Sequence, residues 1–172
     1  FRLPRLKQKD KVFFVFTKGL TADQFSAFSP AVLFRLQSLF AEGAKICLMS
    51  EHAPSFHASQ LGQLHFSLPM IVMDGAAIVD ANENTYLRTV NMDPSSCRWL
   101  IRRLEGLGES FFIYTVHRDR NCIYHHGAMN PLETDVYNHL KKSPYRYYLD
   151  DDHFFVSDVV YLKIVADEAN VK

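Results

Sequence analysis

Small and polar residues stand where three apolar runs of the chain end. Gly19 follows the first run, Ser50 ends the second and Asp74 follows the third. In a parallel sheet, ligands bind outside the carboxyl ends of the strands. A glycine there permits a sharp loop, and a serine hydroxyl beside backbone amides at a helix start can hold a phosphate. These positions are candidates for phosphate binding, although any α/β unit needs polar loop residues at such points.

A second group of residues has the chemistry of metal ligands. His125 and His126 are adjacent, and Asp150–Asp152 precede His153. Neighbouring residues of a strand point to opposite faces, and no third ligand has a spacing that completes a site. Solvated turns are therefore the better interpretation, and no metal site is predicted. Cys122 lies nearby, but no Asn or Asp at a recognisable spacing supports a nucleophilic role.

Aromatic and basic residues near the end of the chain raise the question of nucleic acid. Tyr145–Tyr148, with Arg118 and Arg120, could stack on bases or bind phosphates. The 19 Lys and Arg are balanced by 19 Asp and Glu, so the net charge is zero. Neither nucleic acid nor an anionic membrane surface is therefore an expected partner. An aromatic surface or a protein contact is favoured.

The composition is that of a folded domain. With 172 residues, 48% of them hydrophobic and 13% aromatic, the chain can bury one sizeable core or a core with a smaller companion. Its apolar runs are far shorter than the roughly 20 residues that span a bilayer. The three cysteines are unclustered and odd in number, which favours neither a disulfide framework nor a zinc ribbon. A reducing cytoplasm is the expected compartment.

The first half of the chain alternates strands and helices. β-branched and aromatic runs predict strands buried on both faces, and Ser29 with Pro30 predicts the start of a helix that ends at Gly43. This alternation is typical of a doubly wound α/β unit. The expected elements are strands at 11–16, 45–50 and 69–73, and helices at 30–43 and 54–64.

The pattern changes after Ala76 to that of an α+β domain. Hairpins alternate there with two helices, the first of which has Asp93 as its N-cap. We divide the chain into an extension or linker (1–10), an α/β core (11–80) and an α+β domain (81–172). The elements expected after Ala76 are strands at 77–80, 86–90, 111–116, 122–125 and 158–165, and helices at 94–107 and 131–142.

The order of these elements resembles the N-terminal part of haloacid dehalogenase (HAD)-like phosphatases, and more narrowly the Cof-type branch with a C2 cap. In that family the three strands end in Asp-x-Asp-Gly-Thr, Thr-Gly-Arg and Asn-Gly-Ala. Here Gly19, Ser50–His52 and Asp74–Ala76 fall on these motifs. The resemblance implies a partial Rossmann-like parallel-sheet core followed by an α+β cap. It also implies Mg²⁺-dependent hydrolysis of small phosphorylated metabolites. The phosphate- or substrate-binding positions that it implies are Gly19, Ser50, Glu51, Asp74 and Gly75.

The chain departs from the family at the first motif. The two aspartates, nucleophile and general acid/base, are replaced by Phe16 and Lys18. Phenylalanine can neither attack phosphorus nor bind a hard cation, and a lysine would repel Mg²⁺ by ~8 kcal/mol at 4 Å and an effective dielectric of 20. We therefore expect no bound metal and a catalytically inactive member of the family. The alternatives are an active phosphomonoester hydrolase, if the register is different, and a non-enzymatic binding or assembly module.

The family's later motifs, a lysine and an acidic pair, have no counterpart before Lys172. In complete relatives, strands from that later segment pair with the far side of the first strand. The resemblance therefore predicts an open strand edge beside Phe13 and Val15, which is an aggregation hazard unless it is covered. We expect a segment beyond this chain, a partner chain or a second copy to cover it.

Overall fold

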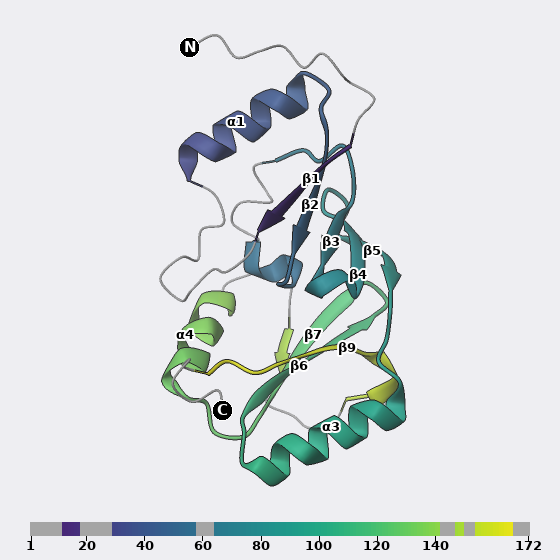
Figure 1. Ribbon diagram of the computed structural model, residues 1–172, viewed down its shortest axis with the longest axis vertical. Coiled ribbons are helices and arrows are strands. Elements are labelled where there is room, and N and C mark those ends of the chain that lie inside the picture. Colours follow the sequence, from purple (N-terminus) through teal and green to yellow (C-terminus); the bar gives the residue numbers. More distant parts are fainter. Residues whose placement is uncertain (1–11, 18–28, 58–63, 142–146, 150–153, 167–172) are drawn as a thin grey trace. The chain divides into compact units, whose positions relative to one another are not determined.

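The computed structural model describes residues 12–17, 29–57, 64–141, 147–149 and 154–166. It divides into a first unit, Phe1–Leu87, and a second unit, Arg88–Lys172. Figure 1 shows that each unit has its own sheet, of five and four strands respectively. None of the described helices combines the length and the apolar character needed to cross a bilayer.

The first unit is a mixed α/β structure, which confirms the predicted fold class. Its strands lie in the order β1-β2-β3-β4-β5, so β1 forms one edge of the sheet among the described strands. The first three strands are parallel and the fourth is antiparallel to the third. The elements are β1 (Val12–Thr17), α1 (Pro30–Ala41), β2 (Lys45–Ser50), β3 (Met70–Val72), β4 (Ala77–Asp80) and β5 (Thr85–Thr89).

The central strands supply the core of the first unit. Leu48 of β2, Met70 and Val72 of β3 and Val79 of β4 are almost completely buried, and Leu36 of α1 is also buried. Strands that are apolar on both faces belong in the interior of a parallel sheet. The continuous apolar runs of the sequence are thus explained by their central position.

Two predicted features of this unit need correction. The helix expected at 54–64 is only a short 3-10 turn, Pro54–His57, and residues 58–63 lie outside the described part. Residues 64–69 form no helix. The doubly wound pattern also stops at β3, because β4 returns antiparallel to it after a second 3-10 turn, Met73–Gly75. A link this short cannot make the crossover that a parallel strand requires.

The second unit has an antiparallel sheet to which one parallel strand is added. Its strands lie in the order β8-β7-β6-β9, and β8 pairs in parallel with β7. The sequence did not predict β8. The elements are α3 (Pro94–Leu107), β6 (Phe111–His117), β7 (Arg120–His126), α4 (Pro131–Leu140), β8 (Tyr147–Leu149) and β9 (Val159–Lys163).

Helix α3 and the sheet share the core of the second unit. Cys97 of α3 is fully buried in a cluster with side chains of three strands. The cluster contains Cys97, Phe111, Ile113, Tyr124 and Val159. Phe111 and Ile113 lie two residues apart on β6, so their side chains share the face of the sheet that packs on α3.

Local signals for the ends of these elements are largely confirmed. Asp93 caps α3, where its carboxylate accepts a hydrogen bond from the backbone N–H of Ser96 at 2.9 Å. Gly108 ends the helix with φ of 72°. The turn between β6 and β7 is shorter than predicted: only Arg118 and Asp119 connect the strands, both with positive φ. Such a two-residue turn matches the twist of a hairpin.

Strands β4 and β5 are neighbours in the first sheet and are joined by a short turn. Strand β5 joins the sheet of the first unit beside β4, so the whole hairpin lies in one sheet. The observed division follows Leu87. The polar turn predicted at 81–85 thus lies in a hairpin of the first sheet.

Candidate functional site

The carboxyl ends of the first three strands meet at one edge of the first sheet. Phe16 pairs with Met49 and Thr17 with Ser50, so β1 and β2 end level with each other. Strand β3 joins β2 through Met49 and Ile71. Lys18 and Gly19, predicted for the same edge, lie outside the described residues.

Ser50 and His52 join this edge to the turn after β3. Ser50 is 5% exposed, and its hydroxyl oxygen accepts a hydrogen bond from the backbone N–H of His52 at 3.0 Å. The carbonyl oxygen of His52 accepts another from the N–H of Met73 at 3.3 Å. The structure therefore brings together the two segments that contain Ser50 and Asp74, as the sequence predicted.

His52 has a packing role that the sequence reasoning missed. Its ring is buried and stacks on Phe56, with 3.8 Å between the ring centroids. Its Nε2 lies 3.4 Å from Oε1 of Glu51, which is one-third exposed. The aromatic residue four positions after His52, in a segment that begins with Pro54, was the available signal. A buried imidazole with local partners thus occupies the family's arginine position.

The turn after β3 has an unusual backbone. Met73, Asp74 and Gly75 have φ angles of 52°, 52° and 91°, all in the left-handed region. Residues other than glycine rarely adopt it, at a cost of roughly 1–2 kcal/mol each. Met73 is buried and Asp74 is exposed, so this geometry places one side chain in the core and turns the next toward solvent. The strain lies at the predicted ligand-binding position, where strained backbone tends to cluster.

In the register that the resemblance implies, this edge lacks the first carboxylate of the family's magnesium site. The first motif position, Phe16, carries no oxygen donor, and hard cations require oxygen ligands. Across the described ranges, no group of three His, Cys, Asp or Glu side chains is arranged to hold a metal. What the edge does offer is a serine hydroxyl, a carboxylate and backbone groups around the ends of three strands.

The remaining candidates lie in the second unit. His125 and His126 point to different partners, Glu133 and Glu105, as alternation along β7 requires. Asp150–Asp152 and His153 lie outside the described residues. Burial raises the pKa of the Cys122 thiol, which disfavours the thiolate that a nucleophile needs.

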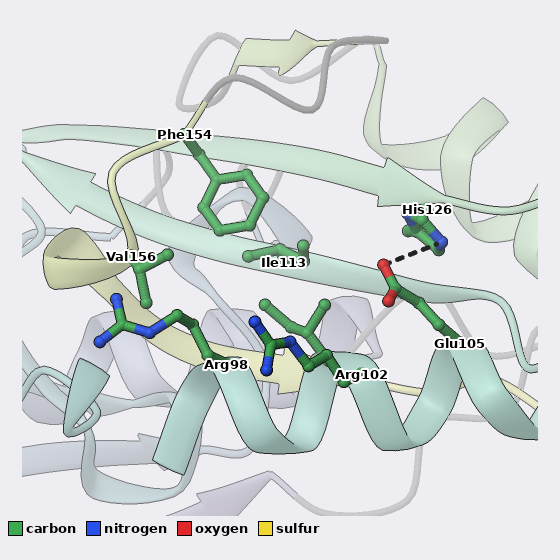
Figure 2. A pocket seen from close by; sticks show the side chains of 8 residues that line it. Arg98, Arg102, Glu105, Ile113, His126, Phe154 and Val156 are labelled. Atoms are coloured by element: carbon green, nitrogen blue, oxygen red, sulfur yellow. Dashed lines mark ion pairs between the residues drawn. The ribbon is translucent and has the colours of Figure 1, made fainter. Parts of the chain in front are cut away.

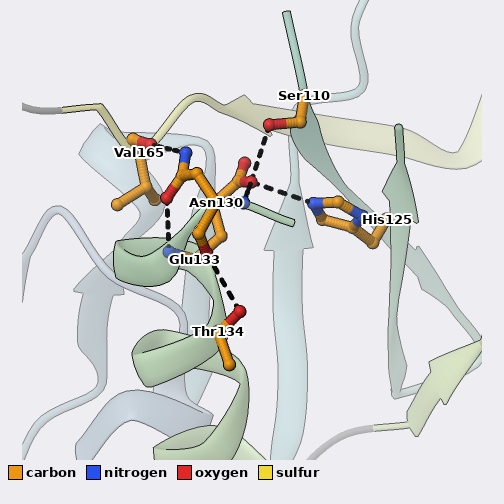
Figure 3. A network of polar contacts seen from close by, with 6 residues as sticks. All are labelled: Ser110, His125, Asn130, Glu133, Thr134 and Val165. Carbon is orange, nitrogen blue, oxygen red and sulfur yellow. Dashed lines mark hydrogen bonds and ion pairs between the residues drawn. The ribbon is translucent and has the colours of Figure 1, made fainter. Parts of the chain in front are cut away.

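The densest polar network of the second unit surrounds Glu133 at the start of α4 (Figure 3). Glu133 is fully buried, and its Oε2 accepts hydrogen bonds from the Ser110 hydroxyl at 2.6 Å and the Asn130 N–H at 3.0 Å. The Asn130 side chain completes a capping box by accepting from the Glu133 N–H, and it donates to the carbonyl of Val165 at 2.7 Å. His125 lies 3.4 Å from the same carboxylate. This network ties four segments of the unit together.

The fold and the strand-end edge define a class of protein with a Rossmann-like core. The haloacid dehalogenase-like hydrolase family matches residues 23–172, and the chain belongs to this family. The match begins after the first motif. No curated protein matches the sequence.

Solved structures support the same fold. A haloacid dehalogenase-like hydrolase from Bacteroides thetaiotaomicron has a TM-score of 0.67 at 16% identity, over 91% of this chain and 58% of that one. A HAD subclass IIB sugar phosphatase has a TM-score of 0.57 at 15% identity, over 81% and 52% of the two chains. A HAD/Cof-like hydrolase from Plasmodium vivax gives 0.59 at 14% identity, over 92% and 57%. The chain spans a little over half the length of these relatives.

Proposed function

We propose that this protein binds a small phosphorylated ligand at the carboxyl ends of β1, β2 and β3 and does not hydrolyse it. The observation that carries the proposal is the position of Phe16, whose backbone pairs with Met49 one residue before both strands end. Matched to the family's first motif, this is the nucleophile position. A hydrocarbon ring there leaves no group to form a phosphoenzyme.

Binding is supported by what remains at the edge. In the register that the resemblance implies, Ser50 matches the family's hydroxyl position. The N–H of Met73, in the turn after β3, donates a hydrogen bond to the carbonyl of His52, two residues after Ser50. A hydroxyl and backbone N–H groups are sufficient to bind an oxyanion without a metal. In this proposal Ser50 donates to the phosphate, while Gly19, Glu51, Asp74 and Gly75 shape the site.

Three further proposals complete this interpretation. The second unit acts as a C2-type cap, since it combines helices with an antiparallel sheet. The protein works in a reducing cytoplasm, in keeping with free cysteines at 47, 97 and 122. The outer edge of β1 pairs with a strand of a second copy or a partner chain. A stable monomer by native mass spectrometry, with no strand added to β1, would contradict the last of these.

The first experiment measures hydrolysis of 4-nitrophenyl phosphate with and without Mg²⁺. We expect no metal-dependent turnover by the unmodified chain, and no thermal stabilisation by Mg²⁺, because a ligand stabilises only the folded state that binds it. The Phe16→Asp, Lys18→Asp double variant restores the motif acids and tests whether they are the missing groups. Metal-dependent turnover by the unmodified chain that Ser50→Ala abolishes would overturn the proposal in favour of an active hydrolase.

The second experiment measures binding of inorganic phosphate by calorimetry. Loss of a hydrogen bond to a charged group costs about 1.5–3 kcal/mol, so Ser50→Ala should weaken binding at least about tenfold. Ser55→Ala is the matched control, because Ser55 is equally buried but lies on the following turn. Equal weakening by both variants would indicate a packing effect rather than a phosphate contact.

A further inference from the structure

A pocket between α3 and the sheet of the second unit combines an apolar wall with two cationic side chains (Figure 2). Its volume is about 300 Å³, at the small end of the roughly 300–1,000 Å³ of ligand pockets. It shares no residue with the edge formed by β1, β2 and β3. Its lining residues are Arg98, Ile101, Arg102, Glu105, Ile113, His126, Phe154 and Val156.

The cationic side of the pocket comes from one helix. Arg98 and Arg102 are four residues apart on α3, so their side chains lie on the same face. Within the described part of the chain, neither guanidinium forms an ion pair with a carboxylate. The one acidic side chain of the pocket, Glu105, lies 3.6 Å from Nε2 of His126. The two arginines therefore give the pocket a net positive charge.

The opposite side of the pocket is apolar. Phe154 and Val156 face α3 across Ile113, which is 2% exposed (Figure 2). Ile101 of α3 also lines the pocket. Contact with this surface removes apolar area of a ligand from water, at about 25 cal/mol per Å². An anion without an apolar part would leave this wall without a contact.

We propose that this pocket binds a small amphipathic anion, with a carboxylate or phosphonate-like head on Arg98 and Arg102 and an aromatic or short aliphatic body against Phe154 and Val156. Guanidinium groups suit such heads because they donate two parallel hydrogen bonds. The size of the pocket restricts the body to one ring or a short chain. The site gives the second unit a ligand of its own, which is distinct from the one proposed for the first unit.

The test is a calorimetric titration of the full chain with phenylphosphonate, whose P–C bond a phosphatase does not hydrolyse. We expect saturable binding that Arg98→Gln, Arg102→Gln weakens at least tenfold and that added salt weakens, because exposed charges are screened. Methylphosphonate, which lacks the ring, should bind several-fold more weakly than phenylphosphonate. Gln removes the positive charge and keeps a polar group that can form hydrogen bonds, and circular dichroism verifies that the double variant is folded.

Two control variants test whether phenylphosphonate binds at this pocket rather than elsewhere on the protein. Arg103→Gln removes a charge from an exposed position of the same helix that does not line the pocket, and it should leave the affinity unchanged. Ser50→Ala acts on the proposed phosphate site, so the same arginine pair is also tested in the Ser50→Ala background. Phenylphosphonate binding that remains there and that Arg98→Gln, Arg102→Gln weakens belongs to the pocket, so failure of the phosphate site and failure of this one are distinguishable. Unchanged affinity in the Arg98, Arg102 double variant, or no saturable binding at all, would overturn the proposal.

Discussion

Two buried histidines, one in each unit, have neighbours of the same kind. His52 stacks on Phe56 and lies 3.4 Å from a Glu51 oxygen. His125 packs edge-on against Phe112, with 4.8 Å between centroids, and lies 3.4 Å from a Glu133 oxygen. Both side chains are 6% exposed, but Glu51 is 33% exposed and Glu133 is fully buried.

The difference between the two clusters lies in how they are built. The two described partners of the His52 ring, Glu51 and Phe56, are within four residues of it, so this ring cluster lies inside one short segment at the proposed ligand site. The carboxylate beside His125 instead holds Ser110 and Asn130 as well, and Asn130 bonds Val165. The first arrangement shapes a loop, whereas the second joins distant parts of the chain. Mutations in the two clusters should therefore change the free energy of unfolding by different amounts.

The largest effect is expected for Glu133→Ala. The substitution removes the capping box and leaves the half-buried Ser110 hydroxyl and Asn130 N–H without their acceptor, which should lower the free energy of unfolding by about 2–4 kcal/mol. Urea unfolding measures this loss. Asp135→Ala, at an exposed position of α4, is the control and should change stability by less than about 0.5 kcal/mol. Similar losses in both variants would contradict the role assigned to the network.

Double-mutant cycles compare the two histidine–glutamate pairs directly. For His125→Ala with Glu133→Ala we expect a coupling energy of about 1 kcal/mol or more, as found for residues of one buried network. For His52→Ala with Glu51→Ala we expect a coupling energy of less than about 0.5 kcal/mol, because water screens the Glu51 carboxylate, which is one-third exposed. Equal coupling energies would show that the two clusters do not differ in kind.

Two glycines test whether the turn after β3 takes part in phosphate binding. Gly75 and Gly43 have φ angles of 91° and 83°, and a Cβ at either position would meet nothing within 4 Å. Replacing either glycine with alanine should therefore lower the free energy of unfolding by about 1 kcal/mol, because of backbone strain alone. Only Gly75→Ala should also weaken phosphate binding, since Gly43 follows α1 away from the strand ends. Equal effects on phosphate binding would argue against a ligand site at the Met73–Gly75 turn.

The smallest expected effect is the pH dependence of stability that comes from the helix caps of the second unit. Hydrogen bonds from Ser95 and Ser96 lower the pKa of Asp93 from 3.8 to about 2. A carboxyl whose pKa is lower in the folded state stabilises the fold above its unfolded pKa and loses that contribution as the pH falls through the folded value. Stability should therefore fall slightly between about pH 4 and pH 2, and Asp93→Asn should lose less over this range. Asn130, the neutral cap of α4, provides no such dependence.

Local features of the fold could be predicted from the sequence. The bounds of α3, its Asp93 cap and strand β2 agree with the prediction because each depends on residues within one segment. The turn at 54–57 was predicted as a longer helix because Pro54 and the apolar residues after it also suit a helix start. Strand β8 was missed because it needs β7 as a partner.

The candidate site could be predicted to a similar extent. The segments that contain Ser50 and Asp74 come together, through His52 and Met73, because parallel strands end at one edge. This follows from the alternation of elements alone. The stacking of His52 and the left-handed turn depend on tertiary packing. The Glu133 network was not predicted for the same reason: its members are up to 55 positions apart, from Ser110 to Val165.

The place of β9 has a consequence for how the second unit folds. This strand pairs with β6 across more than forty residues, and the Asn130–Val165 hydrogen bond follows directly after it. Contacts between distant residues slow folding, because the chain must close a long loop before it gains them. Helix α3 and the β6–β7 hairpin can form early, but the sheet is complete only after β9 has been synthesised. During translation, the second unit should therefore acquire protection from proteases late and in one step.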